Sequence, residues 1–305
     1  MEYREEGPSM IRLLHRGFNY SQDGPGNRLV YHLQGCNLHC PWCSNPESIP
    51  LTGSLTVPDA GALMPEACPF GAIAPDGLNR ALCRDCREKP CAALPGSGVK
   101  LTGAPVEEEA ILGEIERSRP MFFDGGGVTF TGGEPTLQFE ALARLLEALK
   151  ARGVHTALET NGTHPQLPAL FPLIDFLILD VKHYDAARHA QVIGGGQPQI
   201  RRNLTAALAR REQLAVRIPL IGGFNAGEED AAGFAALFRE AAEEADSPFA
   251  QKATLELLRY HEYGKDKWAQ CGREYAMTEA AFVTDEQLAA FERVIRAAGL
   301  PLVHT

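Results

Sequence analysis

Short apolar runs alternate with amphipathic stretches along most of the chain, which suggests strands separated by helices. Some of the runs are continuously apolar, as in Phe176-Leu177-Ile178-Leu179, rather than alternating with polar residues. Continuous apolar strands between helices are typical of a parallel sheet that is covered on both faces. The predicted strands comprise residues 28–33, 128–131, 154–159, 176–179, 214–218 and 254–258.

The amphipathic stretches have the spacing of helices that bury one face. Phe139, Leu142, Leu145, Leu146 and Leu149 recur every three or four residues, which places them on one side of a helix. Further helices are predicted over residues 107–117, 199–213, 228–244 and 285–298.

Residues 58–105 interrupt this rhythm. The segment is rich in Pro, Gly and Cys and contains no long periodic stretch. A structureless loop of this length is uncommon in a compact domain, so we interpret it as a small insert organised around a metal rather than an apolar core. The predicted organisation is a main domain of residues 1–57 and 106–262, the insert, and a C-terminal helical extension of residues 263–305.

Charge and cysteine content limit the function classes. Lys and Arg number 29 and Asp and Glu 39, a balance of −10 that is poorly suited to tracking the phosphates of a nucleic acid. No stretch approaches the roughly 20 apolar residues that span a membrane, and the acidic N-terminus does not resemble an export signal. Eight cysteines in such a chain favour metal binding over disulfides. We therefore expect a soluble protein of a reducing cytoplasm.

The strongest chemical signal is Cys36-Asn-Leu-His-Cys40-Pro-Trp-Cys43, directly after the first predicted strand. Three thiolates can hold three irons of a [4Fe–4S] cube, which ordinarily takes four protein ligands, so one iron would stay open to another ligand. Structural zinc would need a closed set of four ligands, which His39 or a distant cysteine could complete. The spacing favours iron–sulfur but does not by itself decide between the two metals.

A glycine pair follows the second predicted strand, in Thr131-Gly132-Gly133-Glu134-Pro135. Two glycines let backbone approach a ligand closely and Glu134 offers a carboxylate, although such a pair is also common in plain turns. Together with the cysteine loop, this turn resembles the signatures of the radical S-adenosylmethionine (SAM) superfamily. The resemblance implies that SAM binds the open iron and is cleaved to a 5′-deoxyadenosyl radical, with Gly132, Gly133 and Glu134 positioning it.

A narrower resemblance, over about residues 10–268, is to the activating enzymes of glycyl radical enzymes, the family of pyruvate formate-lyase activase. Its motifs occur in the family's order and mostly at predicted strand ends: Asp23-Gly24-Pro25-Gly26-Asn27-Arg28, Cys43-Ser44-Asn45-Pro46-Glu47, Gly125-Gly126-Gly127-Val128-Thr129, Glu159-Thr160-Asn161-Gly162, Asp180-Val181-Lys182-His183, Arg217-Ile218-Pro219, Leu258-Arg259-Tyr260-His261 and Gly264-Lys265-Asp266-Lys267-Trp268. Two positions depart from the family: Ser44 replaces the commoner His, and Glu159 replaces the usual Asp.

The resemblance also implies a fold and further site residues. The expected fold is a partial (β/α)6 TIM-like barrel, which carries its site at the carboxyl ends of the strands. The further residues expected around SAM are Asn45, Thr160, Asp180, Lys182, Arg217 and His261. Taken singly, such side chains are more often merely solvated, but Lys182, Arg217 and His261 follow three different strands and converge on one mouth. The family's monovalent-cation site would comprise Glu159, Thr160 and Asp180, where the longer arm of Glu159 changes the reach of its carboxylate.

Family members with an insert at this place usually carry a bacterial-ferredoxin-like unit with eight cysteines and two clusters. This insert has only Cys68, Cys83, Cys86 and Cys91, so two fully cysteine-ligated clusters are excluded. We predict a ferredoxin-like remnant with one auxiliary [4Fe–4S] cluster held by these four residues. Four thiolates also suit a zinc knuckle, which stays open as the alternative. Cys271 is interpreted as an ordinary free thiol.

The function implied by the resemblance is activation of a partner glycyl radical enzyme. The SAM-derived radical would abstract a hydrogen from the Cα of one partner glycine, with flavodoxin or ferredoxin as the reductant. One alternative is a radical SAM enzyme that acts on a small molecule or a peptide in a closed pocket. The other is a non-catalytic iron–sulfur electron-transfer protein, which would require all cysteine sites to be closed. The sequence does not name the partner enzyme.

Overall fold

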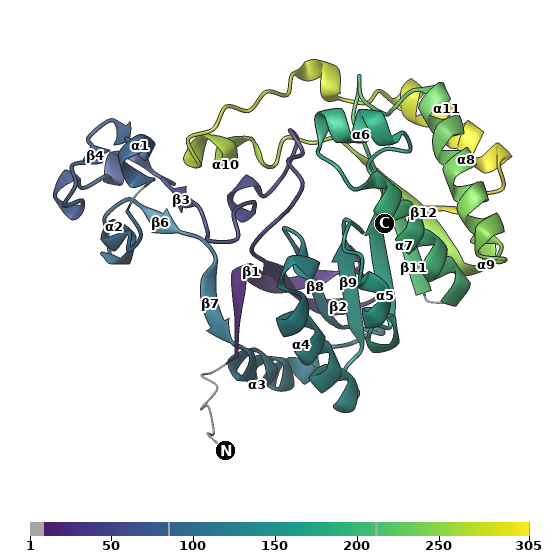
Figure 1. Cartoon of the computed structure of the whole chain (residues 1–305), viewed down its shortest axis with the longest axis horizontal. Helices are drawn as coiled ribbons and strands as arrows, with labels where there is room; N and C mark the ends of the chain where they lie inside the picture. Colours follow the sequence, from purple (N-terminus) through teal and green to yellow (C-terminus); the bar gives the residue numbers. More distant parts are fainter. Residues whose placement is uncertain (1–8, 85, 211–212, 305) are drawn as a thin grey trace.

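The computed structural model describes residues 9–84, 86–210 and 213–304, which build one large sheet flanked by helices, with a small lobe beside it (Figure 1). Six strands of the sheet are parallel and lie side by side in sequence order. They are β2 (Asn27–Leu33), β8 (Gly127–Gly132), β9 (Thr156–Thr160), β10 (Phe176–Asp180), β11 (Gln213–Leu220) and β12 (Ala253–Arg259). All six predicted strands are therefore confirmed, although β9 begins two residues later than predicted.

Three further strands extend the sheet at its edges. β1 (Met10–Tyr20) pairs antiparallel with β2, and β7 (Ala104–Glu107) pairs antiparallel with β1. At the opposite edge, β13 (Leu302–Val303) pairs parallel with β12. None of the three was predicted: β1 lacks a regular apolar pattern because much of it is exposed, and β13 has only two residues.

The predicted helices are present. They correspond to α3 (Glu108–Ser118), α4 (Phe139–Ala151), α7 (Gln197–Arg210), α8 (Glu228–Glu244) and α11 (Asp285–Ala297). The predicted end of the third at Gln213 is wrong, because α7 ends at Arg210 and Gln213 begins β11; residues 211–212 lie outside the described part. Shorter helices are α5 (Leu167–Leu170), α6 (Ala186–Val192), α9 (Phe249–Lys252) and α10 (Lys265–Gln270).

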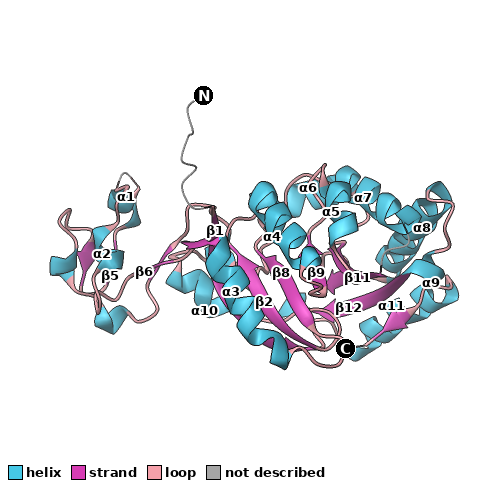
Figure 2. Ribbon diagram, turned by 90° about the horizontal axis from the view of Figure 1, so that it is seen from below, coloured by secondary structure: helices cyan, strands magenta, loops and turns pink. Residues whose placement is uncertain are grey.

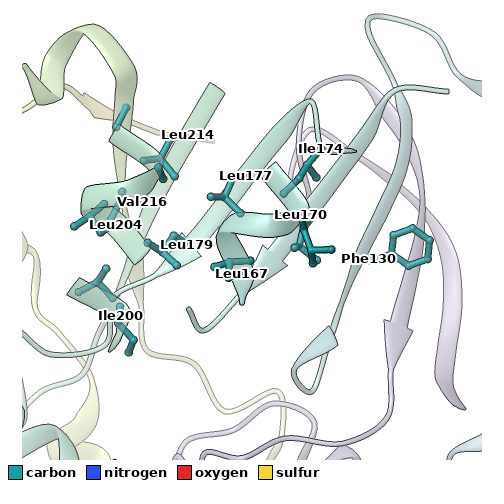
Figure 3. Close-up of a cluster of buried hydrophobic side chains, with 14 of the residues drawn as sticks. Phe130, Leu167, Leu170, Ile174, Leu177, Leu179, Ile200, Leu204, Leu214 and Val216 are labelled. Atoms are coloured by element: carbon teal, nitrogen blue, oxygen red, sulfur yellow. The ribbon is translucent and has the colours of Figure 1, made fainter. Parts of the chain in front are cut away.

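The main core lies between the parallel strands and the helices that follow them. Figure 3 shows Leu167 and Leu170 of α5, Leu177 of β10 and Leu204 of α7 in one cluster of buried side chains. Burial of this apolar surface is the dominant stabilising contribution to the sheet and fixes the carboxyl ends of its strands. Among the described residues, no helix is long and apolar enough to cross a membrane.

The lobe corresponds to the predicted insert and contains short elements (Figure 2). They are β3 (Leu55–Thr56), β4 (Ile73–Ala74), β5 (Gly77–Leu78), α1 (Arg80–Cys83), α2 (Pro90–Ala93) and β6 (Lys100–Leu101). β3 and β6 pair and form a stem through which the chain enters and leaves the lobe. Leu55, Leu63, Ile73 and Val99 form a small buried cluster with Cys91, and Cys68 and Cys83 pack against it. The exact domain boundaries stay predictions.

Candidate active site

The cysteine loop follows β2 and lies at the carboxyl ends of the parallel strands. Backbone hydrogen bonds hold it on two sides: Cys36 N–H donates to Ile49 O (2.9 Å), and His39 N–H donates to Ile193 O (2.9 Å). Cys36, Cys40 and Cys43 line a cavity of about 280 Å³. The loop therefore presents its three thiols to one cavity.

The three thiols are buried to different degrees and share one charged neighbour. Burial raises the pKa of each thiol, to about 12 for Cys36, while the ammonium of Lys182 opposes the rise at all three. Among the residues that the structure describes, no three His, Cys, Asp or Glu side chains converge on a point that could hold a single metal ion. The thiols line the wall of the cavity, and this fits a group of several irons with a charge-bearing neighbour.

The glycine turn packs directly against the start of the cysteine loop. Gly132 has φ of +121°, and a Cβ there would lie 2.4 Å from Leu33 N. A Cβ on Gly133 would lie 2.1 Å from Gly35 O. Only glycine fits at these two positions, and both residues line the cavity with backbone that no side chain covers.

Glu134 lies outside the cavity wall, beside the glycine turn. Its side chain is fully buried and does not line the cavity. Its carboxylate accepts hydrogen bonds from Thr136 N–H (3.0 Å) and Oγ1 (2.5 Å), Thr160 Oγ1 (2.7 Å) and Asn161 N–H (2.7 Å). Burial raises the pKa of Glu134, and these hydrogen bonds oppose the rise. The residue therefore ties the glycine turn to the end of β9.

Asp180 ends β10 and Lys182 follows it, and both residues line the cavity. Lys182 Nζ lies 2.7 Å from Asp180 Oδ2. Burial alone would lower the pKa of Lys182, but Asp180 and the neighbouring cysteines raise it above its ordinary value. The structure thus places the amino group of Lys182 beside the three thiols and in contact with Asp180.

Arg217 is not among the residues that line the cavity. Its Nη1 is 2.9 Å from Glu159 Oε1 and its Nε is 2.7 Å from Glu256 Oε2. Glu159 does line the cavity, and its second oxygen accepts a hydrogen bond from Thr131 Oγ1 (2.6 Å). Arg217 therefore orients Glu159. Sequence reasoning missed Glu256, because its contact with Arg217 joins neighbouring strands.

Asn45, Thr160 and His261 line the cavity as well. Asn45 Oδ1 accepts a hydrogen bond from Lys267 Nζ (2.7 Å), and the imidazole of His261 stacks on Tyr263 with centroids 3.9 Å apart. The Thr160 hydroxyl is directed to Glu134 instead of the cavity space. Of the residues predicted around SAM, only Glu134 and Arg217 lie outside the cavity wall.

The sequence analysis missed His32, which lies on β2 and lines the cavity. Its ring contacts that of His15 in a tilted arrangement with centroids 3.9 Å apart, and its buried Nδ1 has no hydrogen-bond partner among the described residues. Burial, followed by the charges of His15 and Lys267, lowers the pKa of His32 to about 3. The available signal was a histidine within an otherwise apolar strand.

Helix α10 and the turn after it join the cysteine loop to the insert. Trp268 Nε1 donates to Cys43 O (2.9 Å), and a Cβ on Gly264 would lie 2.3 Å from the same oxygen. On the other side, Gln270 O accepts hydrogen bonds from Arg80 Nη2 (2.7 Å) and Val57 N–H (2.9 Å). Arg80 begins α1, which ends at Cys83.

The four cysteines of the insert line a second, smaller cavity. Burial raises the pKa of Cys83 and Cys91, and the neighbouring thiols of the insert raise both further, which places the four close together. The eighth cysteine, Cys271, is buried and free, and it lies outside both cavity walls.

Comparison with known proteins identifies the class to which this site belongs. The family model of the radical SAM superfamily matches residues 30–235, so the chain belongs to this superfamily. Its members use SAM and a [4Fe–4S] cluster. A radical SAM methyltransferase from Sphaerobacter thermophilus is similar in fold, with a TM-score of 0.51, 15% identity, and coverage of 98% of this chain and 74% of that one.

Curated relatives narrow the family. The chain is 35% identical to the isethionate sulfite-lyase activating enzyme of Nitratidesulfovibrio vulgaris, over 84% of this chain and 86% of that protein. It is 34% identical to the choline trimethylamine-lyase activating enzyme of Oleidesulfovibrio alaskensis, over 92% of this chain and 93% of that protein. Within the superfamily, the chain is an activating enzyme for a glycyl radical enzyme.

Proposed function

We propose that Cys36, Cys40 and Cys43 hold the [4Fe–4S] cluster and that SAM binds in the cavity beside them. One observation carries the proposal: the three thiols, the Gly132-Gly133 turn and the Lys182 ammonium line the same cavity. Three protein thiolates leave one iron open for SAM. When bound, the cluster and SAM supply a carbon radical that removes a hydrogen atom from the Cα of a glycine.

The side chains around the cavity bind and orient SAM. Lys182 offers an ammonium to a carboxylate, a charge-assisted contact that is about twice as strong as a neutral hydrogen bond. Gly132 and Gly133 bring unobstructed backbone to the ligand. Asn45 and His261 offer polar atoms elsewhere in the wall, and Asp180 holds Lys182 in place.

Glu134 and Arg217 act as positioning residues rather than as contacts to SAM. Glu134 joins the glycine turn to Thr160 and the end of β9 through buried hydrogen bonds. Arg217 holds the carboxylate of Glu159, which lines the cavity. Both residues fix the shape of the cavity from behind its wall.

A monovalent cation beside Glu159, Thr160 and Asp180 stays a prediction. These side chains are directed to Arg217, Glu134 and Lys182 respectively, so an ion would have to displace one of those partners. Binding of SAM to the reduced protein, measured in potassium and in tetramethylammonium salts, tests this. Equal affinity in the two salts would contradict the cation site.

We also propose that Cys68, Cys83, Cys86 and Cys91 hold one auxiliary [4Fe–4S] cluster. Their position around one small cavity supports it, and four thiolates complete the ligand set of such a cluster. Iron and sulfide analysis of anaerobically reconstituted protein tests it: we expect about eight irons per chain, falling to about four in a Cys83→Ala/Cys91→Ala variant. Four irons together with one zinc ion would show a zinc knuckle instead.

The protein substrate is a glycyl radical enzyme. The reductant of the activating enzyme itself, in the cytoplasm, is flavodoxin or ferredoxin. The two curated relatives above activate different lyases by name, which supports the class of partner and leaves its reaction open. Sulfite-lyases and amine-lyases of the glycyl radical class are the first partners to test.

The central experiment follows one hydrogen atom. Reconstituted, reduced protein receives SAM and a synthetic peptide with the sequence of a glycyl-radical loop, its glycine deuterated at Cα. We expect deuterium in the 5′-deoxyadenosine product by mass spectrometry. Unlabelled product would mean that the substrate is another molecule, and absence of product from protein with full iron and sulfide would contradict the proposed function.

A further inference from the structure

The exposed face of the insert has an unusual combination of apolar and redox-related side chains. Phe70 is 62% exposed and Leu82 is 49% exposed, and both line the cavity that is walled by the four cysteines. Single exposed apolar residues are common, but these two lie beside the thiols. A ligand resting on Phe70 and Leu82 would therefore be separated from the cysteine cavity by its wall alone.

Basic residues flank this apolar centre. Arg84 and Arg87 follow Cys83 and Cys86 along the chain and are exposed, and Lys89 lines the cavity itself. No ion pair involving any of these three side chains occurs among the described residues. Their charges are thus available to a molecule that approaches the face.

The charge of the insert contrasts with that of the remaining chain. Residues 58–105 contain five Lys or Arg and five Asp or Glu, whereas the rest contains 24 and 34, which accounts for the whole balance of −10. An acidic protein would be repelled by the main body. It would meet no net repulsion at the insert, and it would be attracted by the three basic side chains beside Cys83 and Cys86.

A continuous bonded path leads from this face to the cysteine loop. Arg80 lies three residues before Cys83 and donates to Gln270 O of α10, and Trp268 of α10 donates to Cys43 O. Figure 1 shows α10 between the lobe and the part of the chain that carries the large sheet. Covalent and hydrogen bonds thus form a path between the two cysteine sites.

From these observations we propose that the face formed by Phe70, Leu82, Arg84, Arg87 and Lys89 is the docking surface for an acidic one-electron carrier protein. This inference rests on the auxiliary cluster of the proposed function. One electron passes from the reduced carrier to the insert site and then along α10 to the cysteine loop; the carrier is oxidised and no bond forms or breaks. Small interfaces with an apolar centre and a charged rim suit such transient encounters.

The test reverses the charges of the rim, which consists of Arg84, Arg87 and Lys89. In an Arg84→Glu/Arg87→Glu/Lys89→Glu variant of the full-length, reconstituted protein, stopped-flow absorbance follows cluster reduction by a purified, reduced flavodoxin. We expect the second-order rate constant at low ionic strength to fall at least tenfold, with the difference shrinking as salt is added. The control carries equal charge changes on distant exposed positions, Arg202→Glu/Arg239→Glu/Arg293→Glu, and should change less than twofold.

A second electron source separates docking from chemistry. Photoexcited deazaflavin is small and needs no docking surface, so it should reduce both variants and the parent protein at equal rates. If 5′-deoxyadenosine then forms normally, the proposed function stands whatever flavodoxin does. A rim variant that flavodoxin reduces as fast as the control variant overturns the docking proposal. So does a rim variant that, once reduced by deazaflavin, fails to activate a glycyl radical enzyme, because this face would then bind that enzyme.

The apolar centre gives an independent check. Phe70→Ser alters a largely exposed side chain, and the iron content of the variant verifies that the insert still assembles. We expect the flavodoxin rate constant to fall several-fold at every salt concentration, because the substitution removes apolar surface and leaves the charges of the rim in place. An unchanged rate constant would place the docking surface elsewhere.

Discussion

Replacing Glu134 by alanine should destabilise the protein more than any exposed substitution near the site. The carboxylate accepts four hydrogen bonds in a fully buried place, and two of the donors are the backbone N–H groups of Thr136 and Asn161. The two threonine hydroxyls can turn to other acceptors, but the two N–H groups cannot. Each hydrogen bond to a charged group contributes about 1.5–3 kcal/mol, so Glu134→Ala should cost about 3–6 kcal/mol.

The magnitude can be measured as a shift in unfolding temperature. At roughly 2 °C per kcal/mol for a chain of this size, the midpoint should fall by about 6–12 °C in anaerobic calorimetry of the reconstituted protein. Glu134→Gln keeps one acceptor oxygen and should lie between the parent and the alanine variant. Glu140→Ala, an exposed change on α4, should stay within about 0.5 kcal/mol of the parent. A Glu134→Ala midpoint within about 2 °C of the parent, or about 1 kcal/mol, would refute the positioning role.

Three further predictions concern the cavity. Because the pKa of His32 is lowered to about 3 in the folded protein, the unfolded chain binds more protons below about pH 6.5, so the free energy of unfolding decreases as the pH is lowered, by about 2 kcal/mol at pH 5. In calorimetry at pH 7 and pH 5, His32→Phe should show a smaller decrease than the parent. An identical pH dependence of the two proteins would contradict this prediction. Trp268→Phe removes the hydrogen bond to Cys43 O, which contributes about 1 kcal/mol. The variant should lose its cluster absorbance in air faster than the parent. An unchanged rate would show that this hydrogen bond does not protect the cysteine loop. Gly133→Ala places a Cβ 2.1 Å from Gly35 O, so SAM binding measured by equilibrium dialysis should be lost, and parental affinity would show that the turn can shift.

The sequence predicted the parallel strands and the cysteine loop because both depend on local patterns. Apolar runs and cysteine spacing are visible without knowledge of tertiary contacts. The directions of Glu134 and Arg217 were not predictable, since each depends on partners from other elements: Thr160 and Asn161 for one, Glu256 for the other. His32 was missed for a similar reason, because only the folded sheet shows that this strand position faces the cavity.

The paired stem of the insert has a consequence for how this family can diversify. β3 and β6 lie side by side, so the chain leaves the barrel and returns to it at nearly the same point. A short turn could therefore replace the lobe, and the register of the parallel strands would not change. The main disturbance would fall on α10, where the Gln270 carbonyl would be deprived of the guanidinium of Arg80. The stem therefore makes the lobe a separable unit, whose loss would leave the carboxyl ends of the parallel strands in place.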